Sequence, residues 1–509
     1  MADVRSTDPG ERRRKRRRDA HPPVPQRRRQ IVDADSPDLV HMAAHRASVA
    51  DVGERGRQHV HPMAARDHAF HQFARHHDRT AESDGGEVRG RREQNVHAVT
   101  VPCLRCTLGP VKPRLLVLNQ YYWPGVEATA NLLTELCEAL AATYDVTVIT
   151  GASAGQPHQS VRNGVRIVRV RSTTYDRAEL WRRGSNYVTY IAGALREALA
   201  VERPDVIMCM TDPPFIGAIA EIVARRYRAP LLVSTQDVFP EIAVKLGRLG
   251  NPLVIGVLRV LVNFSLRHAD RVVVIGETMK RRVIDKGVQG ERIRVISNWG
   301  DAESVKPQPR DNPWAQANGL VGKFVVMHFG NVGHAQDLDT MIRATTLLRD
   351  LDDLVVTIIG VGARLEELKD LAATLEADKV QFLPWQAYEN RAEPISAADV
   401  HVVGLARGLA GYIVPSRMWG VLAAGRPVIA AAEDESETAG VVRRTRCGVV
   451  VPPGRPAELA RAIRAFHDGE HDLAEMGRRA RAFAEAETDR SIAVSRYEAV
   501  LEELRGRRR

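Results

Sequence analysis

Short apolar runs alternate with helical patterns from residue 114 onward. Residues Arg114–Asn119 (RLLVLN) form an apolar run followed by turn residues, which is typical of a strand buried on both faces. Residues Ala128–Thr143 then place leucines at the spacing of one helix face. This alternation predicts βαβ units and a parallel sheet. The other strands predicted in this half are Val146–Thr150, Val165–Val170, Val206–Met210, Leu231–Thr235, Arg271–Ile275 and Arg292–Ile296, and the other helices are Tyr187–Ala200, Pro213–Arg226, Pro240–His268 and Glu277–Lys286.

The alternation stops between Ser297 and Asn318, where three prolines predict a linker, and then restarts. The chain therefore reads as α/β, with two doubly wound domains facing across a cleft. In such sheets ligands bind beyond the carboxyl ends of the strands, so facing domains can hold one ligand from both sides. The strands predicted in the second half are Phe324–Phe329, Val355–Ile359, Val380–Leu383, His401–Gly404, Val428–Ala431 and Gly448–Val451, followed by a largely helical region, Pro456–Arg507.

Charge is distributed unevenly along the chain. Residues 1–112 hold 22 Lys and Arg against 15 Asp and Glu, a net charge of +7, whereas residues 113–509 carry only +3. The first segment has little apolar periodicity, so we expect a disordered basic extension rich in His and Arg. The alternatives are a basic arm for nucleic acid or anionic lipid, and upstream sequence if the native start lies near Val111. Specific nucleic-acid binding by the whole protein loses most of its support.

The cysteine pattern gives little indication of a metal site, and the apolar runs give little indication of a membrane span. Cys103 and Cys106 form a lone CxxC without the second pair that a structural zinc site needs. The five cysteines suit a reducing, cytoplasmic compartment. No uncharged apolar run reaches the ~18 residues of a membrane span. Leu253–Leu266 is strongly apolar but contains Arg259, and reads either as a core helix or as a helix lying on a membrane surface.

Two loops follow predicted strands and lead into helices. Gly125 follows the first strand of the first half, where a helix N-terminus could meet a phosphate or a sugar hydroxyl. Gly330 and Gly333 occupy the same place in the second half, where backbone N–H groups could face an anion. Neither loop is a GxGxxG fingerprint, which disfavours a nicotinamide dehydrogenase. Asp337 begins a DxD pattern that suits a metal or, preferably, a helix cap.

Three further positions carry candidate chemistry. Ser416 fits a helix start and places Arg417 in the first turn, where a cation is unfavourable unless an anion lies opposite, so Arg417 is a candidate ligand for a diphosphate. The acidic stretch around Glu437 follows a strand end and could accept sugar hydroxyls or be a solvated loop. Asp237 follows a buried strand, where catalytic groups collect, or caps a helix.

Four segments carry a family resemblance: RLLVLNQYYWPGVEATANLLTELCEAL, TQDVFPEIAVKLG, VISNWGD and VPSRMWGVLAAGRPVIAAAEDESE. Together they resemble family 4 glycosyltransferases, in the branch of O-antigen and colanic-acid biosynthesis that includes amino-sugar and fucosyl transferases. The resemblance spans about 114–505. It implies the GT-B fold, with two Rossmann-like domains, and retaining transfer of a hexosyl or amino-sugar group from a nucleotide sugar, UDP- or GDP-linked, without a required cofactor or metal.

The resemblance also implies a division of labour. It places the acceptor mainly on residues 113–300 and the donor on residues 319–488, joined by a linker at 301–318, with 489–509 forming a C-terminal helix that packs back on the first domain. The acceptor would be a glycan or a lipid-linked sugar, used in the cytoplasm or at the inner face of the cell membrane with peripheral membrane contact. The implied donor-binding residues are Gly330, Asn331, Gly333, Ser416, Arg417 and Glu437; the implied acceptor-binding residues are Gly125, Gln236 and Asp237; and the implied catalytic residues are Asp237 and Arg417.

The chain departs from the family pattern at several positions. Asn331 and Gln336 replace a basic pair, and Tyr412 and Gly420 replace two glutamates. Arg417 is therefore the main candidate cation for the diphosphate, and Glu437 matches a different family glutamate. Two other functions stay open: a GT-B nucleotide-sugar epimerase, and a non-enzymatic basic adaptor that acts through the N-terminal segment.

Overall fold

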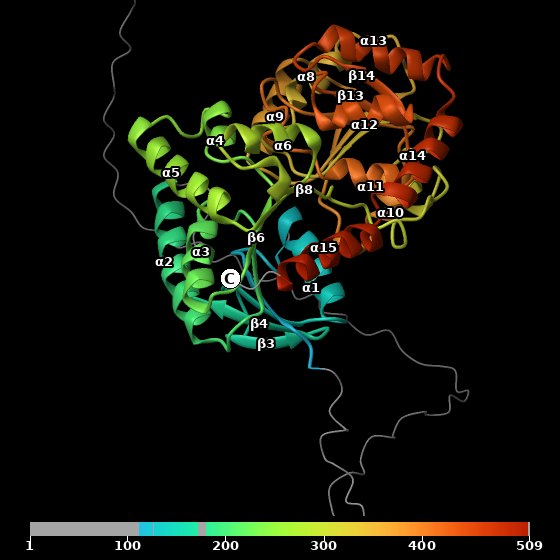
Figure 1. Cartoon of the computed structure of the whole chain (residues 1–509). Coiled ribbons are helices and arrows are strands. Elements are labelled where there is room, and N and C mark those ends of the chain that lie inside the picture. The colour runs from blue at the N-terminus through green and yellow to red at the C-terminus, as the bar shows by residue number, and fades with distance from the viewer. Residues whose placement is uncertain (1–110, 126, 172–179, 507–509) are drawn as a thin grey trace, which may run out of the picture. The chain divides into compact units, whose positions relative to one another are not determined.

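The computed structural model describes residues 111–125, 127–171 and 180–506, and the predicted basic extension lies almost wholly outside them. The described chain contains two sheets flanked by helices, as predicted; both are parallel except for the edge strand β3 of the first sheet (Figure 1). The first sheet has the strand order β3-β4-β2-β1-β5-β6-β7-β8. Its strands are β1 (Arg114–Leu118), β2 (Asp145–Gly151), β3 (Gln159–Arg162), β4 (Val165–Val170), β5 (Val206–Cys209), β6 (Leu231–Thr235), β7 (Arg271–Val274) and β8 (Ile293–Val295).

The second sheet has the order β11-β10-β9-β12-β13-β14 and is parallel throughout. Its central strands are fully buried, which explains why they read as continuous apolar runs in the sequence. Its strands are β9 (Phe324–Phe329), β10 (Leu354–Ile359), β11 (Val380–Leu383), β12 (Val400–Gly404), β13 (Val428–Ala431) and β14 (Gly448–Val451).

Helices cover both sheets. Those of the first half are α1 (Ala128–Leu140), α2 (Leu180–Ala200), α3 (Ile216–Tyr227), α4 (Glu241–Lys245), α5 (Pro252–His268) and α6 (Glu277–Asp285), with the 3-10 turn η2 (Gly290–Arg292). Those of the second half are α7 (Pro313–Ala317), α8 (Leu338–Thr345), α9 (Leu365–Thr374), η3 (Tyr388–Asn390), α10 (Ala392–Ser396), α11 (Arg417–Ala423), α12 (Glu437–Thr445), α13 (Pro456–His467), α14 (Leu473–Glu487) and α15 (Arg490–Arg505).

One prediction was wrong in detail, and one strand was missed. The single helical region predicted over Pro240–His268 is two helices, because Gly247 adopts a left-handed φ of 66° and Asn251 begins a new helix. The Oδ1 atom of Asn251 accepts the N–H groups of Leu253 and Val254, as a helix cap should. The antiparallel edge strand β3 was not predicted, because its sequence, QSVR, has no apolar run.

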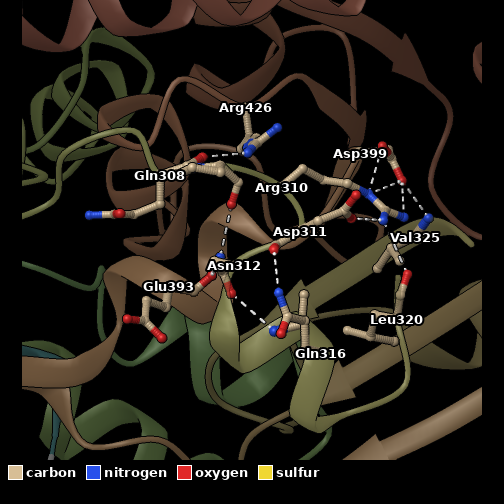
Figure 2. Close-up of polar contacts among 12 residues, drawn as sticks. Gln308, Arg310, Asp311, Asn312, Gln316, Leu320, Val325, Glu393, Asp399 and Arg426 are labelled. Atoms are coloured by element: carbon tan, nitrogen blue, oxygen red, sulfur yellow. Dashed lines mark hydrogen bonds and ion pairs between the residues drawn. The ribbon is translucent and has the colours of Figure 1, made fainter. Parts of the chain in front are cut away.

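The segment between the two sheets is fastened to the second one (Figure 2). Arg310 donates to the carboxylate of Asp399 at 3.0–3.2 Å, and the same carboxylate accepts the N–H of Val325 at the start of β9. Asn312 donates to the carbonyl of Glu393, and Arg426 donates to the carbonyl of Gln308. The proline-rich segment is therefore ordered and hydrogen-bonded to the second domain.

Helix α15 packs back on the first sheet, as predicted. Its apolar residues Tyr497, Val500, Leu501 and Leu504 join the cluster that contains Leu115 of β1. Polar contacts support this packing: the Tyr497 hydroxyl lies 2.8 Å from Ser234 Oγ, and Tyr144 donates to Glu502 at 2.7 Å. Residues from the far end of the described chain therefore complete the core of the first domain.

Candidate active site

The loop after β9 holds the candidate donor-binding glycines. Gly330 has a φ of 139°, which favours glycine, and its N–H donates to the carbonyl of Ile359 at 2.9 Å. The N–H of Gly333 donates to Gln336 Oε1 at 3.0 Å. Both glycine amides are therefore used within the protein, and the loop is fixed from inside. Nε2 of His328 lies 3.2 Å from the carbonyl oxygen of Asn331 and adds a further support.

Close backbone contacts lock this loop onto β12. A Cβ built on Gly404, the last residue of β12, would lie 2.2 Å from the carbonyl oxygen of Gln336. A Cβ built on Gly360 would lie 1.7 Å from the carbonyl oxygen of Gly330. Since real side chains do not tolerate such distances, glycine is needed at both positions. The carboxyl ends of β9, β10 and β12 therefore meet in a tight, preformed turn.

Arg417 lies beside the same turn. A Cβ on Gly330 would lie 3.7 Å from Cβ and Cδ of Arg417, so the glycine packs against the arginine stem. Nη2 of Arg417 donates to the carbonyl of Gly404 at 2.6 Å, whereas Nε is buried and has no acceptor among the described residues. No carboxylate of the described chain lies within ion-pair distance of this guanidinium. Burial lowers the pKa of Arg417 to about 10, so the cation persists at neutral pH.

Two buried histidines face this cation. Burial, and then the charge of Arg417, hold the pKa of His328 well below its usual range, and its Nδ1 has no partner among the described residues. Burial also lowers the pKa of His401 to about 4, and Nε2 of His401 lies 2.8 Å from the carbonyl oxygen of Ile395. Both rings are neutral at physiological pH, and the positive charges that act on them are those of Arg417 and, at His401, also of Arg426. The sequence pattern does not mark these histidines as site residues, because they lie inside apolar strands.

Helix α11 begins at Arg417, as the sequence predicts, with Ser416 as the preceding residue. The Ser416 side chain makes no capping hydrogen bond. The DxD pattern has a structural explanation. Asp339 pairs with Arg364 at 2.6 and 2.7 Å, and Asp337 accepts from Thr340 and from the N–H of Gly454. Asp337 stands at the start of α8 but does not cap its backbone N–H groups.

Glu437 contacts the start of α6. It is the first residue of α12, and a Cβ on Gly276 would lie 2.5 Å from its Oε2, so its carboxylate rests on the backbone at the start of α6. The neighbouring Thr278 donates to the carbonyl of Glu435 at 3.0 Å. The structure therefore brings Asn331, Gly333, Ser416 and Arg417 around Gly330, and places Glu437 against the first domain.

The acceptor-side candidates occupy the carboxyl edge of the first sheet. Asp237 follows β6, and burial, and then the charge of Asp212, raise its pKa to about 7. It lines a cavity of about 10 Å³, room for one water molecule, together with Thr235 and Lys286. Asp237 does not cap α4, whose preceding residue is Pro240. Asp212 was missed, although the signal was present: it follows the buried strand β5 as Asp237 follows β6.

Gln236 and Gly125, the other two acceptor-side candidates, do not line the cavity that holds Asp237. Gln236 is 4% exposed; it accepts from Asn298 Nδ2 at 2.9 Å and donates to Ser234 Oγ at 3.4 Å. Its amide is thus held toward the α15 side of the sheet. The N–H of Gly125 donates to the carbonyl of Tyr122 in the turn after β1, two strands from β6.

Backbone contacts bring the two candidate groups toward each other. The N–H of Val238 donates to the carbonyl of Tyr412 at 2.9 Å. Ile242 of α4 shares an apolar cluster with Ala335 and Leu405, which flank the Gly330 turn and the end of β12. The loop that carries Asp237 therefore packs on the loops that carry the donor-side candidates.

The described part of the chain contains neither a metal-binding cluster nor a membrane-spanning helix. No group of three or more His, Cys, Asp or Glu side chains is placed to hold a metal ion there. None of the helices in residues 111–125, 127–171 and 180–506 is both long and apolar enough to cross a bilayer.

Curated relatives include two bacterial proteins. WbjE of Pseudomonas aeruginosa, named as a glycosyltransferase, is 28% identical over 304 residues, which cover 59% of this chain and 75% of that protein. WcaI of Escherichia coli, named as a colanic acid biosynthesis glycosyl transferase, is 27% identical over 255 residues, 49% of this chain and 62% of that protein.

Solved structures share the fold. Anabaena HepE in complex with UDP aligns with a TM-score of 0.60 and 18% identity, covering 77% of this chain and all of that one. The lipopolysaccharide glycosyltransferase WaaG gives 0.58 and 16% identity, over 77% of this chain and all of WaaG. Two family models match along the chain: the glycosyl transferase 4-like domain at residues 125–299, and the glycosyl transferases group 1 model at residues 312–483. The chain therefore belongs to the family 4 glycosyltransferases of the GT-B fold.

Proposed function

We propose that the protein transfers a hexosyl or amino-sugar group from a UDP- or GDP-sugar to a lipid-linked or glycan acceptor during synthesis of a cell-surface polysaccharide, with retention at the anomeric carbon. The colanic acid role in the name of WcaI and the UDP in the HepE structure support the pathway and the donor class. The reaction needs no metal in this proposal, and it takes place in the cytoplasm or at the inner face of the cell membrane.

The guanidinium of Arg417 carries this proposal. A half-buried cation without a carboxylate partner among the described residues is costly, because its buried N–H group has neither water nor a counter-charge to offset its desolvation. Arg417 has one buried N–H without an acceptor among the described residues and stands at the carboxyl ends of β9 and β12. A diphosphate supplies both the missing charge and the missing acceptor, and arginine can bind it through paired N–H donors.

Negative charge grows on the leaving β-phosphate as the sugar–oxygen bond breaks. Fixed donors at that oxygen lower the barrier, and loss of one such donor costs about 2.7–4 kcal/mol in enzymes. We assign this role to Arg417, with Ser416 and the start of α11 beside it. Asn331 and the Gly330–Gly333 turn would line the diphosphate, with the bare backbone of Gly330 allowing close approach. The N–H groups of Gly330 and Gly333 already have acceptors within the protein. We therefore expect these glycines to make room for the diphosphate, and not to donate hydrogen bonds to it.

We assign Asp237 to orientation of the acceptor hydroxyl. With a pKa of about 7 this carboxyl can accept a hydrogen bond when ionised or donate one when protonated. In a retaining front-face reaction the leaving phosphate itself takes the acceptor proton, so no second carboxylate is required. Gly125 and Gln236 belong to the same acceptor side, Gln236 through its hold on the loop that carries Asp237, and Glu437 is the candidate partner for donor hydroxyls.

Donor binding and turnover of Arg417→Met test the proposal. UDP or GDP should stabilise the wild-type protein, by about 2.7 kcal/mol at a hundred times the dissociation constant. The variant should fold, lose most of that stabilisation, and transfer sugar about 10²–10³-fold more slowly. Arg349→Met is the matched control: Arg349 is exposed and lies before β10, at the edge of the sheet opposite the Gly330 turn. Full nucleotide binding and turnover in Arg417→Met would remove Arg417 from the site.

The other two functions predict different products. An epimerase would release a free epimer without any acceptor, whereas the family assignment and the names of the relatives favour transfer. An adaptor acting through residues 1–112 would lose its function when that segment is deleted, whereas the enzyme should keep its turnover.

A further inference from the structure

The outer face of helix α5 (Pro252–His268) exposes several large apolar side chains. Its residues Leu253, Val254, Val257 and Val260 are 79%, 44%, 60% and 68% exposed. Leu253, Val257 and Val260 have the i, i+4, i+7 spacing of one helix face, while Val262 and Leu266 face the core. Val244 of the neighbouring α4 is also exposed, so five of the 14 exposed large apolar side chains in the described chain lie within residues 244–260.

The charges around this face are of one sign. Residues 242–269 contain Lys245, Arg248, Arg259 and Arg267 and no Asp or Glu. The carboxylate that precedes this stretch, Glu241, is paired with Arg259 at 3.2 Å and with Lys286 at 2.6 Å. On the adjoining α3, the buried carboxylate of Glu221 pairs with Arg225, whose guanidinium lies 5.3 Å from the ring of Phe264. The face is therefore apolar and bordered by cations; of these, Lys245 also lies 5.0 Å from the ring of Tyr412, and Arg259 is paired with Glu241.

We infer that the outer face of α4 and α5 docks on an anionic lipid bilayer. An apolar helix face lying flat on a membrane buries its aliphatic side chains among the acyl chains, while flanking Lys and Arg attract acidic headgroups. A soluble protein partner would need carboxylates opposite these cations, whereas a bilayer of acidic lipids supplies both the apolar layer and the negative charge. We name this surface, Val244–Arg248 with Leu253–Val260, the α5 face.

The position of the α5 face agrees with the proposed acceptor. Val262, Ser265 and Leu266, on the inner side of the same helix, line the cavity that holds Asp237 (Figure 1 shows α5 beside α3). One helix therefore separates the proposed bilayer from the proposed acceptor-orienting carboxyl. The inference rests on the proposed function in this respect, because a lipid-linked acceptor remains anchored in the membrane while its sugar reaches the enzyme.

Vesicle binding by the full chain tests the inference. The wild-type protein should sediment with vesicles of phosphatidylglycerol and phosphatidylcholine, bind pure phosphatidylcholine much less, and dissociate as salt is added. Val257→Ser combined with Val260→Ser should lower the partition coefficient about tenfold or more, since each buried aliphatic side chain contributes on that order. Lys245→Ser combined with Arg248→Ser should lower it on the anionic vesicles only.

Leu347→Ser is the matched control, because Leu347 is 52% exposed and lies in the second domain. It should bind as the wild type does. Equal binding by the wild type and the Val257/Val260 variant would overturn the inference and assign lipid binding to the basic segment 1–112. Absence of vesicle binding by the wild type would overturn it too. So would a wild-type dimer that the Val257/Val260 variant dissociates, because the α5 face would then contact a second copy.

The same samples separate this inference from the proposed function. UDP or GDP should stabilise the Val257/Val260 variant as much as the wild type, and transfer to a soluble acceptor analogue should be unchanged. Loss of vesicle binding with intact nucleotide binding supports the α5 face. Failure of the wild-type protein to bind UDP or GDP would contradict the proposed donor. The vesicle assay would still test the α5 face, because it does not depend on nucleotide binding.

Discussion

Replacing Asp237 with asparagine should make the protein more stable at neutral pH and less active. The carboxyl of Asp237 has a pKa of about 7 in the folded chain, raised by burial and then by Asp212, against 3.8 for an ordinary aspartate. The folded state therefore holds this proton more tightly than the unfolded state. Between these two pKa values the stability of the wild-type protein falls as pH rises, because folding then requires a proton that the unfolded chain has released.

The magnitude follows from the shift. Three pKa units correspond to about 4 kcal/mol, fully developed above pH 7 and absent below pH 4. Asparagine keeps the shape of the side chain and cannot ionise, so Asp237→Asn should escape this penalty. The difference in unfolding free energy between variant and wild type should widen by about 2.5 kcal/mol from pH 5 to pH 8, and then stay level.

Urea denaturation of both proteins at a series of pH values measures this difference. Asp285→Asn, at the exposed end of α6, is the control for loss of one carboxylate. Transfer assays on the same samples should show a lower kcat for Asp237→Asn, since an NH₂ group replaces one carboxyl oxygen and changes the hydrogen bond that orients the acceptor hydroxyl. A stability difference that is independent of pH, or that shrinks as pH rises, would refute the raised pKa and the environment from which it follows.

Two other substitutions probe the supports of the site. Gly404→Ala should destabilise the protein by about 1–3 kcal/mol in urea denaturation, because its Cβ would lie 2.2 Å from the carbonyl oxygen of Gln336; unchanged stability would mean that the Gly330 turn is not locked onto β12. Tyr497→Phe should cost about 0.5–1.5 kcal/mol by removing the hydroxyl that contacts Ser234. Its nucleotide affinity should stay the same, and a large loss of affinity would contradict the separation of the α15 contacts from the donor side.

The periodicity of the chain predicted most of the fold, because strands buried on both faces leave an unbroken apolar run. Phe324–Phe329 and Gly448–Val451, for example, were predicted with the bounds that the structure gives them. Strand β3 has no such run and is held by pairing with β4, so a local pattern could not reveal it. The break between α4 and α5 depends on the backbone at Gly247, which composition alone does not specify.

The site was predictable only in part. Gly330 and Arg417 could be grouped in advance, because both follow strands of one parallel sheet and the carboxyl ends of such strands share an edge. The directions of Gln236 and Glu437 could not be foreseen, since they depend on Asn298 and Gly276, residues far away in the sequence. The sequence also could not show that no described carboxylate pairs with Arg417, because this depends on how the folded chain surrounds the guanidinium.

The return of α15 to the first sheet has a consequence for synthesis on the ribosome. Tyr144 and Glu502, which bond in the folded protein, are separated by 358 residues. At typical translation rates of about 5–20 residues per second, the apolar surface around Leu115 and Leu136 waits roughly 20–70 s for the helix that covers it. During that interval the whole second domain emerges and can fold, so the domain made first is the one finished last, and its uncovered surface is a natural client for chaperones.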